Sequence, residues 1–599
     1  MRKYLFIVLI LLSCKTYSQN YYVSPRGNDA NDGSDTSSNK AWLTLQKAIL
    51  TAQAGSTVYF LDGTYTPTTY THGSDIFHYD PVNDEGYSGT AEARIIYRNY
   101  PNATPIFDLS TPTPAGNYNI GLYMVGVSYV SFYGLTFTGL KQGAVSGPNV
   151  NVIEMVACSN LYFERVVLID NGGAGFRYFS GMGDLQDDYG VTITTDTTKW
   201  INCDAIRNID VGGNYGDGWK LDQDAGAYIL IKGCRALYNA DDGFDVSGSA
   251  TRVAVNNIAF ANGYVVGGNG NGFKFAGPRD TLDYSTIIFV NNLSAYNHTT
   301  NTDGAGFGFP DYQVSDTSYR RANARVYNNT SYKNDIGYIE FANALWKFRN
   351  TVYRNNIGYQ SQKVQDDNNI DVQVLQYYYP ESHNTWDRVS GGYSFEQTDT
   401  VTVTDADFVL IDSTLAAAEL LADRSSNGAL PPITFMKLAE GSDLIEAGTT
   451  YGFSEISSLP GVPDIGLSPN IGIFEYNDTN TTPSVFTSPV SSIKSIHATV
   501  GGNITSDGGR DITQRGIVWG TSANPTLSNN VITVTGTTGA YTTTLRGLSS
   551  NTTYHVRSYA TNAAGTSYGA DVSFTTPEYT QVGSGGKILF YNGKQIIIK

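Results

Sequence analysis

The stretch GCRALYNADDGFD, residues 233–245, contains two landmarks that recur through the middle of the chain. The first is a short run with alternating apolar residues that ends in Asn239. Further copies end at Asn208, Asn262, Asn297, Asn334 and Asn355, and a weaker copy ends at Asp170. One such unit cannot bury its own apolar face, so the copies are expected to stack on one another as the coils of a solenoid.

The second landmark is a glycine followed by an aromatic residue. It occurs at Gly175-Phe176, Gly218-Trp219, Gly243-Phe244, Gly272-Phe273, Gly306-Phe307, Gly337-Tyr338 and Gly358-Tyr359. We expect the aromatic ring to fill the interior of each coil. Because strands in a parallel stack lie about 4.8 Å apart, equivalent residues of successive coils form ladders. The sequence therefore predicts an all-β protein whose main part is a right-handed parallel β-helix.

The β-helix is predicted to occupy residues 19–476. Leu45, Ala48, Ile49 and Ala52 have helical spacing, and Gly55 can end this helix before a strand over residues 57–60. We interpret the helix as an N-terminal cap, because an open solenoid exposes strand edges. A solenoid with capped ends needs no second chain, so we expect a monomer.

A smaller domain is predicted after a polar linker at residues 477–483. Residues 484–577 contain alternating strands and resemble a fibronectin type III β-sandwich. Leu548 precedes Tyr554 by six residues, which resembles the tyrosine-corner region of that domain. Residues 578–599 form a C-terminal tail that resembles a hairpin, with Asn592-Gly593 at its turn.

The N-terminus has the pattern of an export signal. Basic residues precede an apolar run and then small residues within positions 1–18, and the run is too short to span a bilayer. We expect a protein that is secreted or lies in the periplasm or at the cell surface, with no membrane span. Cys14 lies in a stretch that also resembles a bacterial lipoprotein box, so a lipid anchor at this residue is the alternative.

Charge and composition exclude several classes of function. The net charge of −17 repels a phosphate backbone, so nucleic acid is excluded as a partner. Only three cysteines follow position 18, and this odd number argues against a disulfide framework. The six histidines are scattered and form no cluster with cysteine, so a zinc site has little support.

The residues that follow the glycine–aromatic pairs are candidates for the functional face. In successive coils they are Arg177, Lys220, Asp245, Lys274, Gly308, Ile339 and Gln360. Four acids are expected to converge on this face, namely Asp217, Asp241, Asp242 and Asp245. Four neighbouring carboxylates repel one another strongly unless a cation lies between them. All-oxygen ligands with no His or Cys nearby are typical of a calcium site.

Lys274 occupies the rung next to Asp245. A neighbouring divalent cation and desolvation would both favour its neutral amine, which would make it a base. The alternative is purely structural: Asp241 and Asp242 belong to a capped turn, and Asp245 and Lys274 form an ion pair between rungs. Candidate contacts to a uronate substrate are Arg177, Lys220, Arg235 and Arg279. The first two are alternatively exposed structural charges, whereas the last two could bind a carboxylate bidentately.

Three segments together resemble polysaccharide lyase family nine, the pectate-lyase-like β-helix enzymes. They are GDGWK at residues 216–220, the stretch at residues 233–245, and GNGNGFK at residues 268–274. The resemblance implies that Asp217, Asp241, Asp242 and Asp245 hold a catalytic calcium ion. It also implies that Lys274 removes a proton. The implied reaction is β-elimination in a galacturonate-containing acidic polysaccharide of plant or algal origin, such as pectate.

Other functions remain open at this point. Rhamnogalacturonan or another uronate polymer is an alternative substrate for a lyase. A β-helix glycoside hydrolase would use clustered Asp residues as acid and base instead, and it would leave no double bond in its product. A non-catalytic carbohydrate-binding surface protein would use calcium only to brace the coils.

Overall fold

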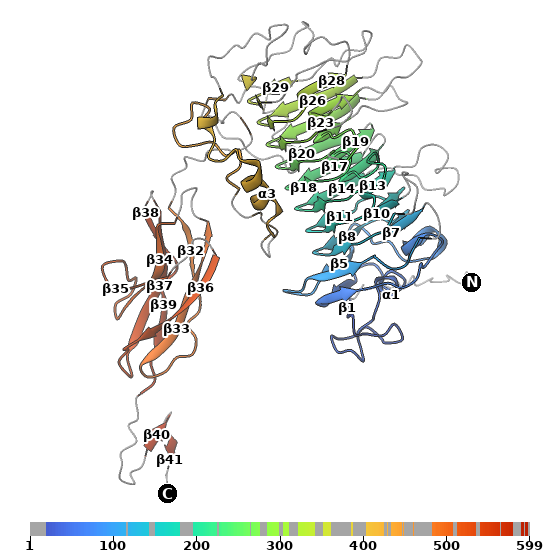
Figure 1. The fold of residues 1–599 in the computed structure, drawn as a ribbon. Helices are drawn as coiled ribbons and strands as arrows, with labels where there is room; N and C mark the ends of the chain where they lie inside the picture. The colour runs from blue at the N-terminus through green and yellow to red at the C-terminus, as the bar shows by residue number, and fades with distance from the viewer. Residues whose placement is uncertain are drawn as a thin grey trace, which may run out of the picture. The chain divides into compact units, whose positions relative to one another are not determined.

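The computed structural model describes residues 19–599 except for 115–117, 143–149, 180–195, 224–226, 249, 264, 276–283, 299–303, 311–320, 342–351, 361–384, 387–402, 425–427, 429, 431–432, 446, 449–458, 460–471, 473–481, 507–511, 535–538, 563–564, 579–588, 592–593 and 597–599. The chain divides into two compact units, residues 1–475 and 476–599 (Figure 1).

The first unit is a parallel β-helix in which each coil contributes to three sheets in turn (Figure 1). Sheet 1 has the order β1 (Asn20–Val23), β2 (Thr57–Phe60), β5 (Ile95–Asn99), β8 (Val130–Tyr133), β11 (Tyr162–Glu164), β14 (Asp196–Ile201), β17 (Ala227–Lys232), β20 (Thr251–Val255), β23 (Tyr284–Val290), β26 (Arg321–Tyr327) and β29 (Val352–Arg354). Sheet 2 has the order β3 (Gly63–Tyr65), β6 (Pro105–Asp108), β9 (Thr136–Thr138), β12 (Val167–Ile169), β15 (Asp204–Ile206), β18 (Arg235–Leu237), β21 (Ile258–Phe260), β24 (Leu293–Ala295), β27 (Thr330–Tyr332), β30 (Ile357–Tyr359) and β31 (Thr385–Trp386). Sheet 3 runs from β4 (Asp75–Tyr79) through β7 (Asn119–Val125), β10 (Val150–Val156), β13 (Ala174–Phe179), β16 (Trp219–Gln223), β19 (Phe244–Gly248), β22 (Phe273–Phe275) and β25 (Ala305–Pro310) to β28 (Ile336–Phe341). The predicted parallel β-helix is therefore confirmed.

The predicted N-terminal cap is present as α1 (Leu45–Ile49). The side chain of Thr44 accepts a hydrogen bond from the backbone N–H of Lys47 at 3.0 Å, which caps the first turn. Leu45, Ala48 and Ile49 are buried against the first coils. Two short 3₁₀ helices are η1 (Pro81–Asn83) and η2 (Asp405–Asp407).

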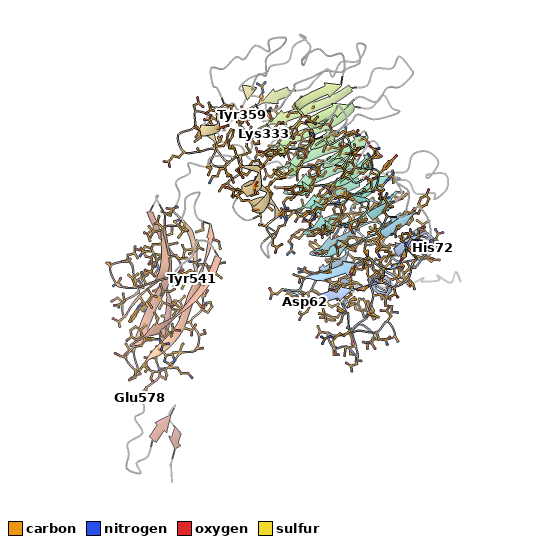
Figure 2. The ribbon with its side chains drawn as sticks, viewed as in Figure 1. Asp62, His72, Lys333, Tyr359, Tyr541 and Glu578 are labelled. Atoms are coloured by element: carbon orange, nitrogen blue, oxygen red, sulfur yellow. The ribbon has the colours of Figure 1, made fainter. Side chains whose placement is uncertain are left out.

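Stacked aromatic rings fill the interior of the coils, as the glycine–aromatic pairs predict. Phe176 stacks on Trp219 with ring centroids 5.2 Å apart, and Trp219 stacks on Phe244 at 4.6 Å. The stack continues from Phe244 to Phe273 at 4.8 Å and to Phe307 at 5.0 Å. Side chains pack along the whole described length of this unit (Figure 2). Burial of these rings supplies much of the apolar driving force for stacking.

The glycine of each pair is required by the close approach of successive coils. A Cβ atom on Gly218 would lie 2.6 Å from the carbonyl oxygen of Gly243. A Cβ atom on Gly243 would lie 2.7 Å from the carbonyl oxygen of Gly272. Both distances are shorter than real Cβ contacts, so a side chain at these positions would push the coils apart.

The recurring Asn residues form a buried ladder next to sheet 2. The Nδ2 groups of Asn208 and Asn239 each donate to the Oδ1 atom of the next Asn at 3.0 Å, and that of Asn262 donates to Asn297 at 2.8 Å. The ladder begins one coil earlier, where Asn171 donates to Asn208 at 3.0 Å. The weak copy therefore ends at Asn171 and not at Asp170, because the register of β12 with β15 aligns Val167 with Asp204.

The last predicted copy, which ends at Asn355, does not form a strand of sheet 2 as the other copies do. Residues 352–354 form β29 of sheet 1, whereas the Asn355-Asn356 pair occupies the position that Asn328-Asn329 has one coil earlier. Tyr359 consequently aligns with Tyr332 in sheet 2. The Gly358-Tyr359 pair thus does not belong to the interior stack of sheet 3, and Gln360 is not part of the charged ladder.

A later segment covers the outside of sheet 2. The helix α3 (Ser413–Leu421) buries Ala416 and Leu420, which pack in one apolar cluster with Leu237, Phe260 and Phe435. Asp412 caps the helix by accepting hydrogen bonds from two backbone N–H groups of the first turn at 2.9 Å. Sheet 2 is therefore buried on both faces over these coils.

The second unit is an antiparallel β-sandwich, as predicted. One sheet contains β32 (Ser484–Thr487), β33 (His497–Ser506) and β36 (Gly539–Arg546), and the other contains β35 (Asn530–Thr533), β34 (Gln514–Gly520), β37 (Thr553–Asn562) and β38 (Gly565–Tyr568), with β39 (Val572–Thr575) paired to β37. The Tyr554 hydroxyl accepts a hydrogen bond from the N–H of Ser549 at 2.8 Å, as in a tyrosine corner. Membership of the fibronectin type III family stays a prediction. The strands β40 (Leu589–Tyr591) and β41 (Lys594–Ile596) form an antiparallel hairpin near the C-terminus.

Within the described ranges, no helix has the length and apolar character that a bilayer crossing requires. The predicted export signal at residues 1–18, with Cys14, lies outside the described residues.

The Asn ladder predicts a large loss of stability on truncation. Asn262→Ala would leave the N–H and Nδ2 groups of Asn239 without their acceptor. It would also remove one of the two donors to Asn297 Oδ1, and all of these groups are buried. We expect unfolding to become easier by about 2 to 4 kcal/mol, measured as a lower Tm and urea midpoint. Asn214→Ala is the matched control, because Asn214 is exposed. Equal Tm values for the two variants would contradict a stabilising ladder.

Candidate functional site

Sheet 3 arranges the predicted charged residues as one ladder. The parallel register aligns Arg177 with Lys220, Lys220 with Asp245, and Asp245 with Lys274. The next two rungs are Gly308 and Ile339. The predicted order along the face is therefore confirmed up to Ile339, and charge is confined to the rungs before Gly308.

Three of the four predicted acids meet at this ladder. Asp217 and Asp242 stand just before β16 and β19, and the N–H of Gly218 donates to the carbonyl of Asp242 at 3.0 Å, which keeps the two turns in register. One carboxylate oxygen from each of Asp217, Asp242 and Asp245 lies within 4.8 Å of the others. All three side chains are buried.

Hydrogen bonds fix these carboxylates only in part. Asp242 Oδ1 accepts from the backbone N–H of Asn271 at 2.8 Å and from its Nδ2 at 2.7 Å. Asp217 Oδ1 accepts from the N–H of Asp242 at 3.3 Å. Asp217 Oδ2 is buried with no hydrogen-bond donor, and the nearest ammonium, Lys220 Nζ, is 3.8 Å away. This oxygen is thus available to a cation.

Asp241 lies beside these three acids, but its carboxylate is not in the group whose oxygens all lie within 4.8 Å of one another. Its Oδ1 atom accepts a hydrogen bond from the N–H of Asn269 at 2.6 Å, and the side chain is buried. Asp242 and Asp217 are near enough to interact electrostatically with it. Its role as a fourth ligand therefore stays a prediction.

Two lysines neutralise part of this charge. Lys274 Nζ donates to Asp242 Oδ2 at 3.1 Å and to Asp245 Oδ2 at 3.2 Å. Lys220 Nζ donates to the same oxygen of Asp245. Four carboxylates and two ammonium groups leave two negative charges uncompensated if all six are ionised. A single divalent cation would balance them.

The pKa values of the acids are shifted in opposite directions. Burial, reinforced by Asp242 and Asp245, raises the pKa of Asp217 to about 7. Burial and the charges of Asp242 and Asp217 raise the pKa of Asp241 well above its usual range. Burial also opposes the ionisation of Asp245, but the ammonium groups of Lys220 and Lys274 outweigh it and lower the pKa of Asp245 to about 2. Without a cation, the carboxylates farthest from the lysines hold protons most readily.

The donor set fits a hard cation. Its ligating atoms are carboxylate oxygens, one of which is buried without a partner, and the described residues of the cluster offer no nitrogen or sulfur ligand. Calcium prefers oxygen donors of this kind.

Arg235 requires a correction, because the structure places it away from the acid cluster. It lies on β18 in sheet 2, is 3% exposed, and binds Asp204 through two hydrogen bonds of 2.8 and 2.7 Å. Its Nη1 atom donates to the carbonyls of Leu420 and Ala422, at the C-terminal end of α3. Arg235 therefore anchors α3 to sheet 2, and its predicted bidentate contact is made to Asp204 and not to a substrate.

Of the other predicted substrate contacts, Arg177 and Lys220 lie on sheet 3. Arg177 lies on β13 in the ladder, and its guanidinium carbon is 4.3 Å from the centroid of the Phe179 ring. Lys220 lies on the next rung and reaches the acids. Arg279 is outside the described residues.

Asn271 belongs to the site but is not among the predicted site residues. Its side chain donates to Asp242, while its Oδ1 atom accepts from the N–H of Ala305 at 2.9 Å. It occupies the turn position equivalent to that of Asp217 and Asp242. Its place in this series is the sequence feature that identifies it as a site residue.

Comparisons with known proteins identify the family of the β-helix unit. Residues 21–368 match the family described as "Pel9A-like, right handed beta helix region". The chain is 30% identical to pectate lyase L of Dickeya dadantii (strain 3937) over 474 residues, which cover 76% of this chain and 90% of that protein. It is 25% identical to pectate lyase PEL9 of Emericella nidulans over 459 residues, with coverages of 71% and 93%.

A solved structure has the same fold. The crystal structure of pectate lyase Pel9A superposes with a TM-score of 0.54 and 24% sequence identity, and covers 77% of this chain and 97% of that chain. The expected right-handed form of the parallel β-helix is thereby confirmed.

Because the charge of the acid cluster is only partly compensated, we expect the stability of the folded chain to depend on pH. Asp217 has a pKa of about 7 in the folded chain against 3.8 as its ordinary value, so the folded state holds this proton more tightly. Its contribution to stability is complete below about pH 4 and is lost as the pH rises through 7, at up to about 1.4 kcal/mol per pH unit. In chelator, we expect Tm to fall over this range, and added calcium to restore it at pH 7 and above.

Asp217→Asn should reduce the fall, because an amide cannot ionise. Asp84→Asn is the control, since Asp84 is exposed and away from the cluster. A fall in Tm that is equally steep in wild type and in both variants would contradict the assignment to Asp217.

Proposed function

The chain belongs to the Pel9A-like right-handed β-helix family and is a polysaccharide lyase, and we propose that it cleaves galacturonate-containing polymers with a bound calcium ion and Lys274 as its base. The observation that carries this proposal is the juxtaposition on sheet 3 of three buried carboxylates and the Lys274 amine, 3.1 and 3.2 Å from two of them. An acidic polysaccharide such as pectate is the substrate class that this site suits.

The acids are proposed to hold the cation and not to attack the substrate. Asp217, Asp242 and Asp245 would supply ligand oxygens, with Asp241 beside them. Bound calcium supplies positive charge that attracts a uronate carboxylate and stabilises the negative charge that develops there as C5 loses its proton. Asn271 keeps Asp242 in place by donating two hydrogen bonds to it.

Lys274 is proposed to remove the C5 proton. Its side chain is 15% exposed, so the amine can reach a sugar ring that lies on sheet 3. Carboxylates that are engaged by a divalent cation no longer stabilise the ammonium form of Lys274, which favours the neutral amine that a base requires.

Elimination then follows on the substrate. The C5–H electron pair forms the C4–C5 double bond, and the C4–O bond to the leaving sugar breaks with its electrons on oxygen. The leaving oxygen takes up a proton, and the new non-reducing end is a 4,5-unsaturated uronate. Because the base must be neutral, activity is expected to rise toward alkaline pH.

Arg177 and Lys220 are proposed to bind the carboxylates of neighbouring sugar units. Both lie on the rungs that precede Asp245 on the same face. Their positive charges offset the repulsion between an acidic protein and an acidic polymer. We also propose export of the protein, since a polymeric substrate of this kind is met outside the cell.

The lyase assignment is tested by ultraviolet absorbance of the unsaturated product. With polygalacturonate and calcium, we expect absorbance to rise, and we expect chelator to abolish the rise. Lys274→Ala should lower kcat by about 10²- to 10⁴-fold, the usual contribution of a general base. Rhamnogalacturonan in a parallel reaction identifies the polymer.

Lys199→Ala is the matched control, because Lys199 lies on β14 in sheet 1. Full activity of Lys274→Ala, or activity that chelator does not change, would contradict the proposed mechanism. New reducing ends without absorbance would indicate hydrolysis.

Substrate contact by Arg177 is tested separately. Arg177→Ala should raise KM about tenfold or more and lower kcat less, because the side chain would bind the polymer without touching the reacting atoms. Arg207→Ala is the control, since Arg207 pairs with Asp170 on the other side of the coils. An unchanged KM for Arg177→Ala would exclude Arg177 from the binding face.

A further inference from the structure

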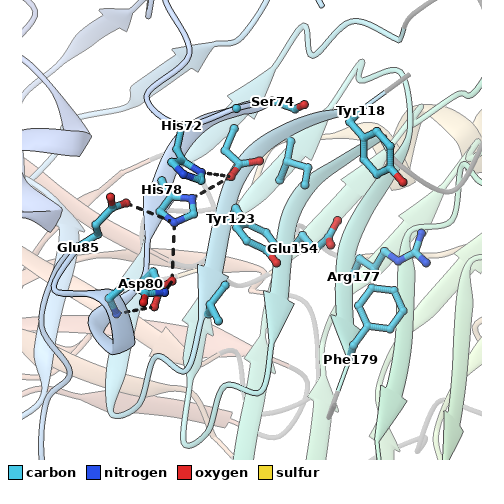
Figure 3. Close-up of a pocket in the computed structure, with 15 residues that line it drawn as sticks. His72, Ser74, His78, Asp80, Glu85, Tyr118, Tyr123, Glu154, Arg177 and Phe179 are labelled. Atoms are coloured by element: carbon cyan, nitrogen blue, oxygen red, sulfur yellow. Dashed lines mark hydrogen bonds and ion pairs between the residues drawn. The ribbon is translucent and has the colours of Figure 1, made fainter. Parts of the chain in front are cut away.

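A polar pocket opens on sheet 3 toward the N-terminal end of the ladder (Figure 3). The rungs that precede Arg177 are Glu154, Tyr123 and His78. The pocket has a volume of about 520 Å³ and is lined by these residues on one side and by the turn before β4 on the other. It is therefore separate from the acid cluster, although both occupy the same sheet.

Three potential metal ligands meet in this pocket, namely His72, Asp75 and His78. One ligand atom from each lies within 4.8 Å of the others. Asp75 Oδ2 is 2.8 Å from His78 Nδ1 and 3.9 Å from His72 Nδ1. The two imidazole rings lie side by side with centroids 4.4 Å apart (Figure 3). Asp75 and His78 are buried, whereas His72 is exposed to the pocket.

The local backbone brings these residues together. The N–H of Asp75 donates to the carbonyl of His72 at 2.7 Å, which closes a tight turn, and Gly73 within it has a φ of 51°. The amide of Gln46 on α1 holds His78 from both sides: it accepts from the His78 N–H and donates to its carbonyl, each at 2.8 Å. The His78 backbone is thus fixed before any ligand binds.

Carboxylates behind His78 orient its ring. Its Nε2 atom is 3.4 Å from Glu85 Oε2 and 4.0 Å from Asp80 Oδ2 (Figure 3). Asp80 is itself held by hydrogen bonds from Val82 and Asn83. A histidine that binds metal through one nitrogen commonly donates the other N–H to a carboxylate in this way. The Nδ1 atom is therefore the one directed at Asp75 and available to a metal.

The charge of the pocket also favours a cation. Asp75, Asp80, Glu85 and Glu154 contribute four carboxylates, against the single guanidinium of Arg177.

We propose that His72, Asp75 and His78 form a zinc site. Two imidazole nitrogens and one carboxylate oxygen suit zinc, in contrast to the all-oxygen acid cluster, which suits calcium. The donor atoms are 2.8 to 4.8 Å apart, so small side-chain rotations, chiefly of the exposed His72, bring them to zinc-ligand distances. Three protein ligands leave a further coordination position that faces the pocket.

The test is calorimetric titration of the chelator-treated, dialysed protein with zinc chloride in excess calcium chloride, so that calcium occupies the acid cluster. We expect one zinc ion to bind per chain. His72→Ala should weaken zinc binding at least tenfold, and this exposed residue can be replaced without loss of the fold. Glu85→Gln should weaken it about tenfold by removing the charge behind His78.

His298→Ala is the matched control, because His298 is also exposed and its Nδ1 atom lies 2.6 Å from Asp335. It should bind zinc as the wild type does. The proposal is overturned if the wild type shows no zinc binding, which would mean that a proton alone occupies the site. It is also overturned if His72→Ala binds zinc as tightly as His298→Ala. Neither result depends on lyase activity.

Discussion

The parallel register between successive coils is the constraint on which the rest of the structure depends. The functional side chains on sheet 3 come from several successive coils, so the neighbours that they have in other coils are set by backbone hydrogen bonds and not by sequence proximity. A slip of one residue between β19 and β22 would turn Lys274 to the other face of the sheet. The buried Asn ladder and the stacked rings oppose such a slip, because either would lose its partners in every coil.

This rigid register is what allows like charges to be held together. Asp217 and Asp242 are fixed by the same turns that bring Gly218 and Gly243 into close backbone contact. Mutual repulsion cannot separate the carboxylates without separating the coils, so burial and this repulsion together raise the pKa values of Asp217 and Asp241. The interior packing thus maintains a strained electrostatic arrangement that a cation can relieve.

Much of the fold and of the site could be predicted because both are periodic. The glycine–aromatic pairs identify the interior stack, and the residues next to them identify the ladder up to Ile339. Periodicity misleads where a strand of another sheet carries a similar motif, as at Asn355, which follows β29 of sheet 1 and pairs with Asn328. Arg235 shows a second limit, since its partner Asp204 is one coil away but its partner Leu420 in α3 lies 185 residues later in the chain. No local pattern contains that contact.

The pocket that contains His72, Asp75 and His78 also lies beyond what a local sequence pattern predicts. His72 and His78 look scattered in the sequence, and they meet only because a tight turn and Gln46 fix the start of sheet 3. Two regions of this sheet consequently differ in donor chemistry, with nitrogen and oxygen near β4 and oxygen alone near β19. Because hard and borderline cations select between such donor sets, the two proposed metal sites would differ in the cation that each prefers.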